Sequence, residues 1–276
     1  MAEITAAAVK ALREQTGLPM MDCKKALQES DGDLEKAVEL LRKAGKKTME
    51  KRAGRETTSG RIAIYLDPDQ KVGSIIDLRC ESAPVATNTE FMQLADDLAK
   101  QLATGPGAAT PDELLDQPSP SNPSQTLRQQ FDDLNNRIRE VFKLERIERI
   151  DGLCGGYAHH NGATAVLLHI EGGSLDLAKD ICMHAAAMRP TVLCVDDLDA
   201  AVVAKEREIL AEAARQEGKP ENIIEKMVEG RLQNFYAEQC LTEQPFVKDD
   251  SQTVGKVADG ADMKLIRFVH WELGKE

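Results

Sequence analysis

The sequence predicts an α+β protein with a small three-helix unit, a core in two successive halves, and a projecting antiparallel helical hairpin. Three observations support this fold class. Apolar residues recur at helical spacing through residues 1–45, and β-rich runs separated by a short turn begin at residue 61. Two charged helical stretches flank a Gly-Lys-Pro break at residues 218–220. A chain of 276 residues is also long for a single hydrophobic core.

The composition is that of an acidic protein with few aromatic side chains. The formal net charge is −12, and aromatic residues make up 4% of the chain. Broad affinity for nucleic acid or for anionic membranes is therefore not expected, because both attract positive charge. No apolar run approaches a membrane span and the first residues lack a signal-peptide core, so we expect a cytoplasmic protein. The six cysteines form no C-x-x-C pair and are interpreted as reduced thiols.

The first unit, residues 1–45, is expected to contain three short helices. Pro19 suits the first position of the second helix, where its missing N–H costs no hydrogen bond. Asp33 suits the N-cap of the third helix, which is expected to end near Gly45. The basic, polar stretch at 46–55 then predicts an exposed linker.

The first half of the core, residues 56–145, opens with a predicted β-hairpin. Its strands are residues 61–66 and 72–80, and Asp67-Pro68-Asp69 forms the turn. The pair Thr87 and Glu90 has the spacing of a capping box and predicts the start of a helix.

The rest of this half alternates between loop and helix signals. Residues 104–124 are rich in proline and predict a loop or linker. A helical pattern then resumes over residues 127–144. We therefore expect strands first and helices afterwards within this half.

The second half, residues 146–276, has the same order of signals and is interpreted as a pseudo-repeat of the first. We expect a strand at 162–171, a helix at 174–187 and another strand at 191–195. The helical hairpin, residues 199–240, is an insertion in this half, and its polar surface indicates that it projects from the body.

The motifs of common enzymes are missing from the sequence. There is no phosphate-binding loop, and the glycine cluster at 152–156 lacks the order that cradles a pyrophosphate. We expect no metal at His159 and His160, because neighbouring residues on a strand point to opposite faces. His184, among alanines on a predicted helix, is interpreted as a packed histidine. A binding protein is favoured over an enzyme with an unrecognised site, and neither catalytic residues nor a cofactor are predicted.

One stretch of the first unit carries a family resemblance. Residues 16–27 read TGLPMMDCKKAL, followed in register by Gly32-Asp33 and Leu41-Arg42. This order closely resembles the N-terminal domain of bacterial elongation factor Ts. Further blocks resemble the same family and extend the likeness over nearly the whole chain: residues 218–235, residues 243–255, the Y-x-H motif of Tyr157 and His159, and residues 183–190.

The resemblance implies a function and a fold. Proteins of this family are guanine-nucleotide exchange factors for elongation factor Tu: they bind Tu·GDP, speed GDP release and leave when GTP rebinds. The implied partner is Tu in its GDP-bound and nucleotide-free forms, with no cofactor, no direct nucleic acid and no membrane. Stoichiometry stays open, with a dimer or a 2:2 complex among the alternatives. The implied fold is a ubiquitin-associated-like helical domain, a two-part α+β core with antiparallel sheets, and a coiled-coil hairpin.

The resemblance also identifies a departure. The family usually has T-D-F-V after the strand cysteine, and its Asp-Phe pair helps to displace Mg²⁺ from Tu. This chain has Ser82, Ala83, Pro84 and Val85 there, without the acid or the ring. Pro84 is expected to bias Ala83 towards extended backbone and to pre-organise the loop. We expect a small apolar wedge, with a plain connector as the alternative.

Four further contact residues follow from the resemblance. Arg13, Met20 and Met21 correspond to the family's contact with the nucleotide-binding domain of Tu, and one methionine is expected to face inward and the other outward. His159 is the candidate in the second half of the core. The rival interpretation is a ubiquitin-type adaptor, which accounts only for the first 45 residues.

Overall fold

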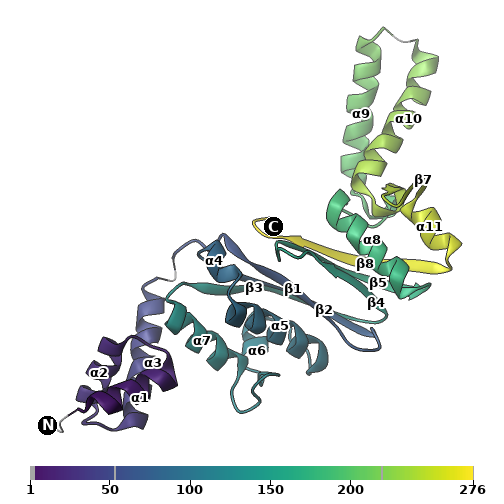
Figure 1. Ribbon diagram of the computed structural model, residues 1–276. Helices are drawn as coiled ribbons and strands as arrows, with labels where there is room; N and C mark the ends of the chain where they lie inside the picture. The colour runs from purple at the N-terminus through teal and green to yellow at the C-terminus, as the bar shows by residue number, and fades with distance from the viewer. Residues whose placement is uncertain (1–3, 53, 219, 276) are drawn as a thin grey trace.

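The computed structural model describes residues 4–52, 54–218 and 220–275. The three-helix unit lies at one end of an elongated molecule, two sheets lie in the middle, and the helical hairpin stands off at the other end (Figure 1). The combination of helices with antiparallel sheets confirms the α+β class. Ala53 of the expected linker and Lys219 of the hairpin break lie outside the described residues.

The first unit contains α1 (Ala6–Thr16), α2 (Met20–Glu29) and α3 (Leu34–Glu50). The Thr5 hydroxyl accepts a hydrogen bond from the Ala8 N–H at 3.2 Å and so caps α1. Pro19 is the N-cap of α2 rather than its first residue. The buried side chains of the unit come from all three helices: Val9, Leu12, Cys23, Ala26, Leu27, Ala37 and Leu41.

The third helix is longer than expected. It continues to Glu50, so the expected end near Gly45 is wrong, and the first part of the expected linker at 46–55 is helical. Gly45 does not end the helix, because it serves close packing instead: a methyl group at this position would collide with the Asn136 side chain of α7 (Leu127–Ile138).

Each half of the core contains one three-stranded antiparallel sheet. The first has the order β1-β2-β3, with β1 (Ser59–Leu66), β2 (Val72–Cys80) and β3 (Phe142–Asp151). The second has the order β4-β5-β8, with β4 (Cys154–Ala158), β5 (Thr164–Gly172) and β8 (Met263–Glu272). In both, two adjacent strands are followed by helices and then by a strand that pairs with the second. This shared order supports the predicted pseudo-repeat.

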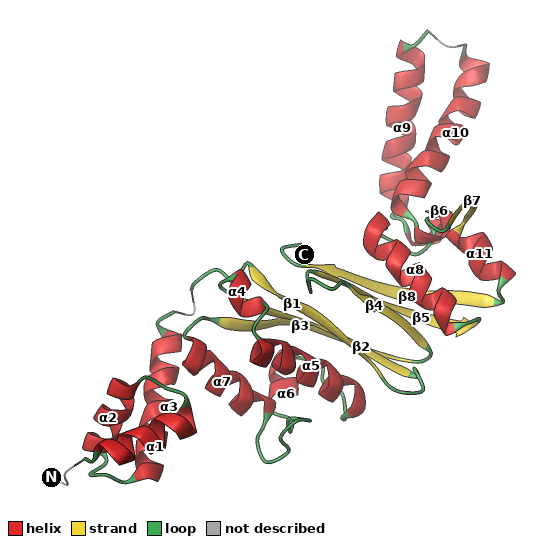
Figure 2. Cartoon of the chain, in the orientation of Figure 1, coloured by secondary structure: helices red, strands yellow, loops and turns green. Residues whose placement is uncertain are grey.

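The two sheets are stacked between layers of helices (Figure 2). α5 (Thr89–Thr104), α6 (Pro111–Leu115) and α7 cover the first sheet, whereas α8 (Leu175–Met188) and α11 (Val254–Gly260) cover the second. Apolar side chains from both sheets fill the space between them and form the inter-sheet cluster: Ile62, Ile75, Ile150, Cys154, Ala165, Leu167 and Val269, with Trp271 at its edge.

Arg146, held by a buried carboxylate of the first sheet, joins the two halves of the core. The Asp77 side chain is fully buried and accepts hydrogen bonds from Arg79 Nη2 at 3.0 Å and from Arg146 Nε at 3.1 Å. The Arg146 guanidinium also lies 4.6 Å from the centre of the Trp271 ring. The two arginines offset the desolvation of the carboxylate, and the stack connects the first sheet to β8 of the second.

The proline-rich stretch at 104–124 is not a free linker. It contains α6, whose residues Leu114 and Leu115 are buried in the core beneath the first sheet. The Thr110 hydroxyl caps this helix by accepting a hydrogen bond from the Glu113 N–H at 3.2 Å. Proline is tolerated here because Pro111 occupies the first turn, where no backbone donor is lost.

Two boundaries in the first half differ from expectation. The Asn88 side chain caps α5 by accepting from the Glu90 and Phe91 N–H groups, so Thr87 is not the cap. The helix predicted at 127–144 ends at Ile138, because Arg139 adopts a left-handed backbone with φ 64°. Residues 142–151 then form β3, so the expected division between residues 145 and 146 falls inside a strand of the first sheet.

In the second half, the strand expected at 191–195 is absent from the described residues. Val192 makes a single isolated bridge to Cys240, and a 3₁₀ turn follows at Val195–Asp197. The third strand of the sheet is β8 instead. The hairpin consists of α9 (Ala200–Gln216) and α10 (Glu221–Gln239), as predicted; their facing side chains include Ala214, Ile224, Val228 and Leu232. A short β6–β7 ribbon (Pro245–Phe246 and Asp249–Thr253) leads to α11.

His184 is a packed histidine, as expected, and it predicts a pH dependence of stability. Its ring is fully buried: Nδ1 accepts from the Val247 N–H at 3.2 Å, and Nε2 donates to Gln244 Oε1 at 2.9 Å. Burial lowers the pKa of His184 below its usual value, although the hydrogen bond with Gln244 acts in the opposite direction. The unfolded chain therefore binds a proton at this histidine more readily than the folded chain does. The contribution of His184 to the free energy of unfolding is complete above about pH 6.5 and is lost as the pH falls below that value.

We expect His184→Gln to weaken the fall in urea midpoint between neutral pH and pH 5. The exposed histidine His160 provides the control, since His160→Gln should leave the pH profile unchanged. An identical profile in wild type and His184→Gln would contradict this explanation.

Candidate functional site

The stretch that departs from the family pattern forms a short helix, α4 (Ala83–Ala86), at the end of β2. The expected extended backbone at Ala83 is wrong, because Ala83 is the first helical residue. Pro84 follows it in the first turn, a position that loses no helical hydrogen bond. The Thr87 hydroxyl closes the turn by donating to the Pro84 carbonyl at 3.0 Å.

Only part of this stretch faces solvent. The side chains of Ala83 and Pro84 are exposed, and together they form what we term the α4 tip. Val85 is half-buried and packs against the core beneath the first sheet. Ser82 is bound by Glu140, through its N–H at 3.0 Å and its hydroxyl at 2.5 Å. Of the four predicted residues, Ala83 and Pro84 are therefore the two that present apolar surface outward.

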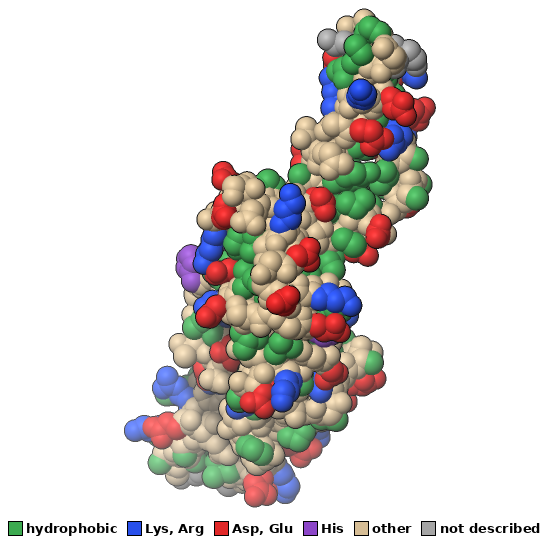
Figure 3. All heavy atoms as spheres, turned by 90° about the vertical axis from the view of Figure 1, so that its right-hand side faces the viewer, with side chains coloured by type: hydrophobic (Ala, Val, Ile, Leu, Met, Phe, Trp, Pro, Cys, Tyr) green, Lys and Arg blue, Asp and Glu red, His purple; other side chains and the backbone are tan. Residues whose placement is uncertain are grey.

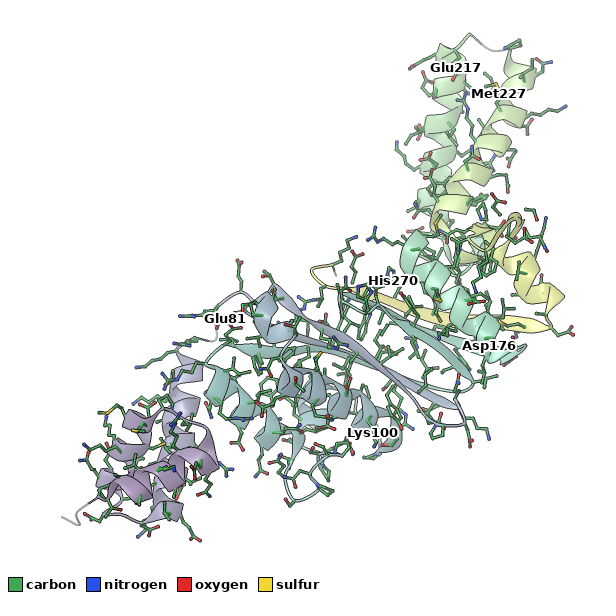
Figure 4. All side chains as sticks on the ribbon, viewed as in Figure 1. Glu81, Lys100, Asp176, Glu217, Met227 and His270 are labelled. Carbon is green, nitrogen blue, oxygen red and sulfur yellow. The ribbon has the colours of Figure 1, made fainter. Side chains whose placement is uncertain are left out.

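Glu81 anchors the base of this stretch (Figure 4). Its carboxylate accepts from the Val141 N–H at 2.7 Å and from Arg55 Nη1 at 2.9 Å. Burial acts to raise the pKa of Glu81, but these two hydrogen bonds and the positive charges of Arg55 and Arg52 together outweigh it and lower the pKa. The carboxylate is thus charged at neutral pH and fixes the end of β2 against the turn that precedes β3.

The predicted residues of the first unit are all exposed. Arg13 lies in the last turn of α1, and Met20 and Met21 form the start of α2 with exposures of 52% and 71%. The expectation that one methionine faces inward is wrong. Leu18, from the turn before α2, packs against the unit's core, and the inward side chains of α2 begin only at Cys23.

His159 lies in the turn after β4 and not on a strand, so its predicted geometry with His160 is wrong as well. The two rings lie with centroids 4.3 Å apart, and His159 Nδ1 is 2.7 Å from the Tyr157 hydroxyl. The same turn is hydrogen-bonded to the first sheet: the Ile62 N–H of β1 donates to the Gly162 carbonyl of the turn at 2.8 Å. His159 is therefore placed near the start of β1, which pairs with the end of β2 before α4.

Two residues that sequence reasoning missed connect the predicted ones. Arg139 binds Asp22, in the first turn of α2, and the neighbouring Glu140 binds Ser82. The first turn of α2 and the N-cap of α4 are thus joined through adjacent residues. No local signal identified this pair, because the sequence predicts a helix through both positions.

The described residues contain neither a metal-binding group of side chains nor a membrane-spanning helix. On the face with the hairpin towards the viewer, acidic and basic side chains are interspersed and apolar side chains gather along the hairpin (Figure 3). Across residues 4–52, 54–218 and 220–275, no group of three or more His, Cys, Asp or Glu side chains is arranged to hold a metal ion. In the same part of the chain, no helix has the length and apolarity needed to cross a membrane.

Comparisons with known proteins agree on one family. Residues 84–275 match the family model described as Elongation factor TS. Elongation factor Ts of Methylococcus capsulatus is 43% identical, with 99% of this chain and 92% of the relative covered. The protein of the same name from Thioalkalivibrio sulfidiphilus is 40% identical over 99% and 92%, and that from Aquifex aeolicus is 40% identical over 96% of each chain. This near-complete coverage does not support the adaptor interpretation, and the chain belongs to the elongation factor Ts family.

Proposed function

We propose that this chain promotes GDP release from elongation factor Tu by docking the α4 tip beside the bound nucleotide, while the first turn of α2 contacts the nucleotide-binding domain. Membership of the elongation factor Ts family supports the exchange role and the partner. Exchange breaks no covalent bond, so the chain acts by binding rather than as an enzyme. His159, at the same end of the sheets as α4, is the proposed contact from the second half of the core.

The observation that carries this proposal is the exposed, apolar α4 tip at the position where the family resemblance places an Asp-Phe pair. Neither Ala83 nor Pro84 can offer a charge or an aromatic ring. The tip therefore acts by its volume, in a shape that the proline ring and the short helix fix before binding. A rigid contact loses less conformational entropy on docking than a flexible loop does.

The binding free energies of nucleotide and of this chain on Tu are linked. If this chain weakens nucleotide binding by some factor, nucleotide weakens binding of the chain by the same factor. Accelerating release by about a thousandfold needs a barrier lower by roughly 4 kcal/mol. The proposed contact supplies this amount by disturbing the phosphate and magnesium site of Tu. The proposed partner forms are Tu·GDP and nucleotide-free Tu, and the mass of the complex in solution decides among a 1:1 complex, a dimer and a 2:2 complex.

The test is stopped-flow release of a fluorescent GDP from Tu, with and without this chain, over a range of Mg²⁺ concentrations. We expect strong acceleration. An acceleration that shrinks as Mg²⁺ rises would indicate that the tip acts through the metal, and a constant acceleration would indicate action on the phosphate or base. Binding without acceleration at any Mg²⁺ concentration would overturn the proposed function.

The tip itself is tested by Pro84→Gly, which removes the ring and loosens the first turn. We expect the maximum rate of GDP release to fall about tenfold, because the tip loses volume and must be ordered on docking. Pro123→Gly is the matched control, since Pro123 is also exposed but lies in the loop between α6 and α7. Equal rates for wild type and Pro84→Gly would favour the plain-connector alternative.

A further inference from the structure

The turn between α7 and β3, residues 139–141, binds a residue beside each surface assigned to the partner: Asp22 next to Met21, and Ser82 next to the α4 tip. We propose that this turn is a positioning element for exchange: it holds the first turn of α2 and the α4 tip in one fixed relative placement, so that both meet Tu together. The inference rests on the proposed function. Arg139 and Glu140 act by orienting the contact residues and not by touching the partner themselves.

Glu140 determines the orientation of α4. Ser82 is the N-cap of α4, yet its hydroxyl makes no capping hydrogen bond to its own helix. The hydroxyl donates to Glu140 Oε1 at 2.5 Å, and the Ser82 N–H donates to Oε2 at 3.0 Å. A helix of four residues is not stable on its own. The direction of the α4 tip is therefore set by a two-point bond from a residue outside the helix.

Arg139 connects the first turn of α2 to the core, beside the Arg42–Asp133 ion pair and the packing of Gly45 on Asn136, which hold α3 against α7. The φ of 64° and ψ of 28° at Arg139 lie in the left-handed region that glycine occupies more readily than arginine. The arginine side chain gives a reason for accepting this strain, because its guanidinium binds Asp22, two residues beyond Met20. Arg52 in turn donates to the Arg139 carbonyl. The two bonds connect α2 and the residues that follow α3 to one residue of the core.

Val141 completes the connection. Its N–H donates to Glu81 Oε1 at 2.7 Å, and Glu81 Oε2 accepts from Arg55 at 2.9 Å. The next residue, Phe142, pairs with Cys80 at the end of the first sheet. Each of the three residues of the turn thus bonds to a different neighbouring segment, and the strand that follows begins at once.

Holding two contact surfaces in register has a defined consequence for binding. Once one surface has docked, the second meets its site at a high effective concentration, and this gain is lost if the relative geometry is wrong. Loosening Glu140 should free only the α4 tip, whereas loosening Arg139 should free only the first turn of α2, because the Arg42–Asp133 ion pair still holds α3 against α7. The two changes should therefore affect different parameters of exchange.

For Glu140, we measure how the rate of GDP release depends on the concentration of this chain. Glu140→Ala should lower the maximum rate about tenfold and leave the half-saturating concentration nearly unchanged, because the first unit still docks. Glu140→Gln should stay within about threefold of wild type, since the amide keeps an acceptor for the Ser82 N–H. Glu145→Ala is the matched control: it removes an ion pair with Lys143 in β3 and touches neither surface.

For Arg139, Arg139→Gly keeps the left-handed turn and removes the bond to Asp22. We expect the half-saturating concentration to rise about tenfold with little change in the maximum rate, and the thermal midpoint not to fall. Asp22→Asn should reproduce this effect. The double variant should be no worse than either single variant, because both remove the same interaction.

The outcomes separate this inference from the proposed function. If Pro84→Gly slows exchange while Glu140→Ala and Arg139→Gly leave both kinetic parameters unchanged, the positioning role is wrong and the wedge stands. If Glu140→Ala lowers the thermal midpoint together with the rate, and Glu140→Gln fails to restore either, the role is structural only. If none of the three variants changes exchange, the wedge fails together with the positioning role that depends on it.

Discussion

The double variant Met20→Asp/Met21→Asp is expected to bind nucleotide-free Tu roughly a hundredfold more weakly than the wild type. Both side chains are more than half exposed at the start of α2 and contribute nothing to the buried core of the unit. Placing two carboxylates there would force their desolvation in any apolar contact. The unit should still fold, because acidic residues are favourable in the first turn of a helix.

Leu34→Asp is the matched control for this prediction. Leu34 is another exposed large apolar residue of the same unit, at 42%, and it begins α3 as Met20 begins α2. Calorimetric titration of nucleotide-free Tu with each variant measures the dissociation constants to be compared. Equal affinities for wild type and the methionine variant, or an equal loss in Leu34→Asp, would remove the first turn of α2 from the proposed contact.

The second large effect concerns stability: Phe91→Ala should lower the free energy of unfolding by about 4 kcal/mol. Phe91 is fully buried in α5 beneath the first sheet. Its ring meets Phe142 edge to face, with centroids 5.0 Å apart and planes at 78°. Since Phe142 also contacts Phe131 at 5.8 Å, the cavity left by the substitution cannot close without disturbing a second aromatic pair.

Urea denaturation followed by circular dichroism measures this loss. Phe235→Ala provides the comparison, because Phe235 is only half-buried in the hairpin and should cost about 1–2 kcal/mol. A loss below about 2 kcal/mol for Phe91→Ala would mean that α5 relaxes into the space.

The elements that the sequence predicts well are those with complete local signals. The hairpin of β1 and β2 has a turn of Asp67-Pro68-Asp69 between two β-rich runs, and α9 and α10 flank a glycine-proline break. By contrast, β3 and β8 are edge strands with many charged residues, and each pairs with a strand far away in the sequence. Their conformation depends on that distant partner more than on local propensity.

The candidate site shows the same division. The family resemblance proposed Ala83, Pro84 and the two methionines as contacts from short contiguous motifs, and they stay a prediction. It could not reveal Glu140 or Arg139, whose bonds to Ser82 and Asp22 span 58 and 117 residues. Arg139, with its left-handed backbone, ends α7 at a point where the helical pattern of the sequence continues. The predicted end of this helix was therefore wrong, and the contact of Arg139 with Asp22 could not be predicted.

The stack of Arg146 on Trp271 provides an intrinsic optical reporter. Trp271 is the sole tryptophan of the chain, and its ring lies at the edge of the inter-sheet cluster, where the two halves of the core meet. Its emission spectrum therefore depends on whether those halves stay in contact. A red shift that precedes the loss of helical signal would reveal that the halves separate before either one unfolds, without any label attached to the protein.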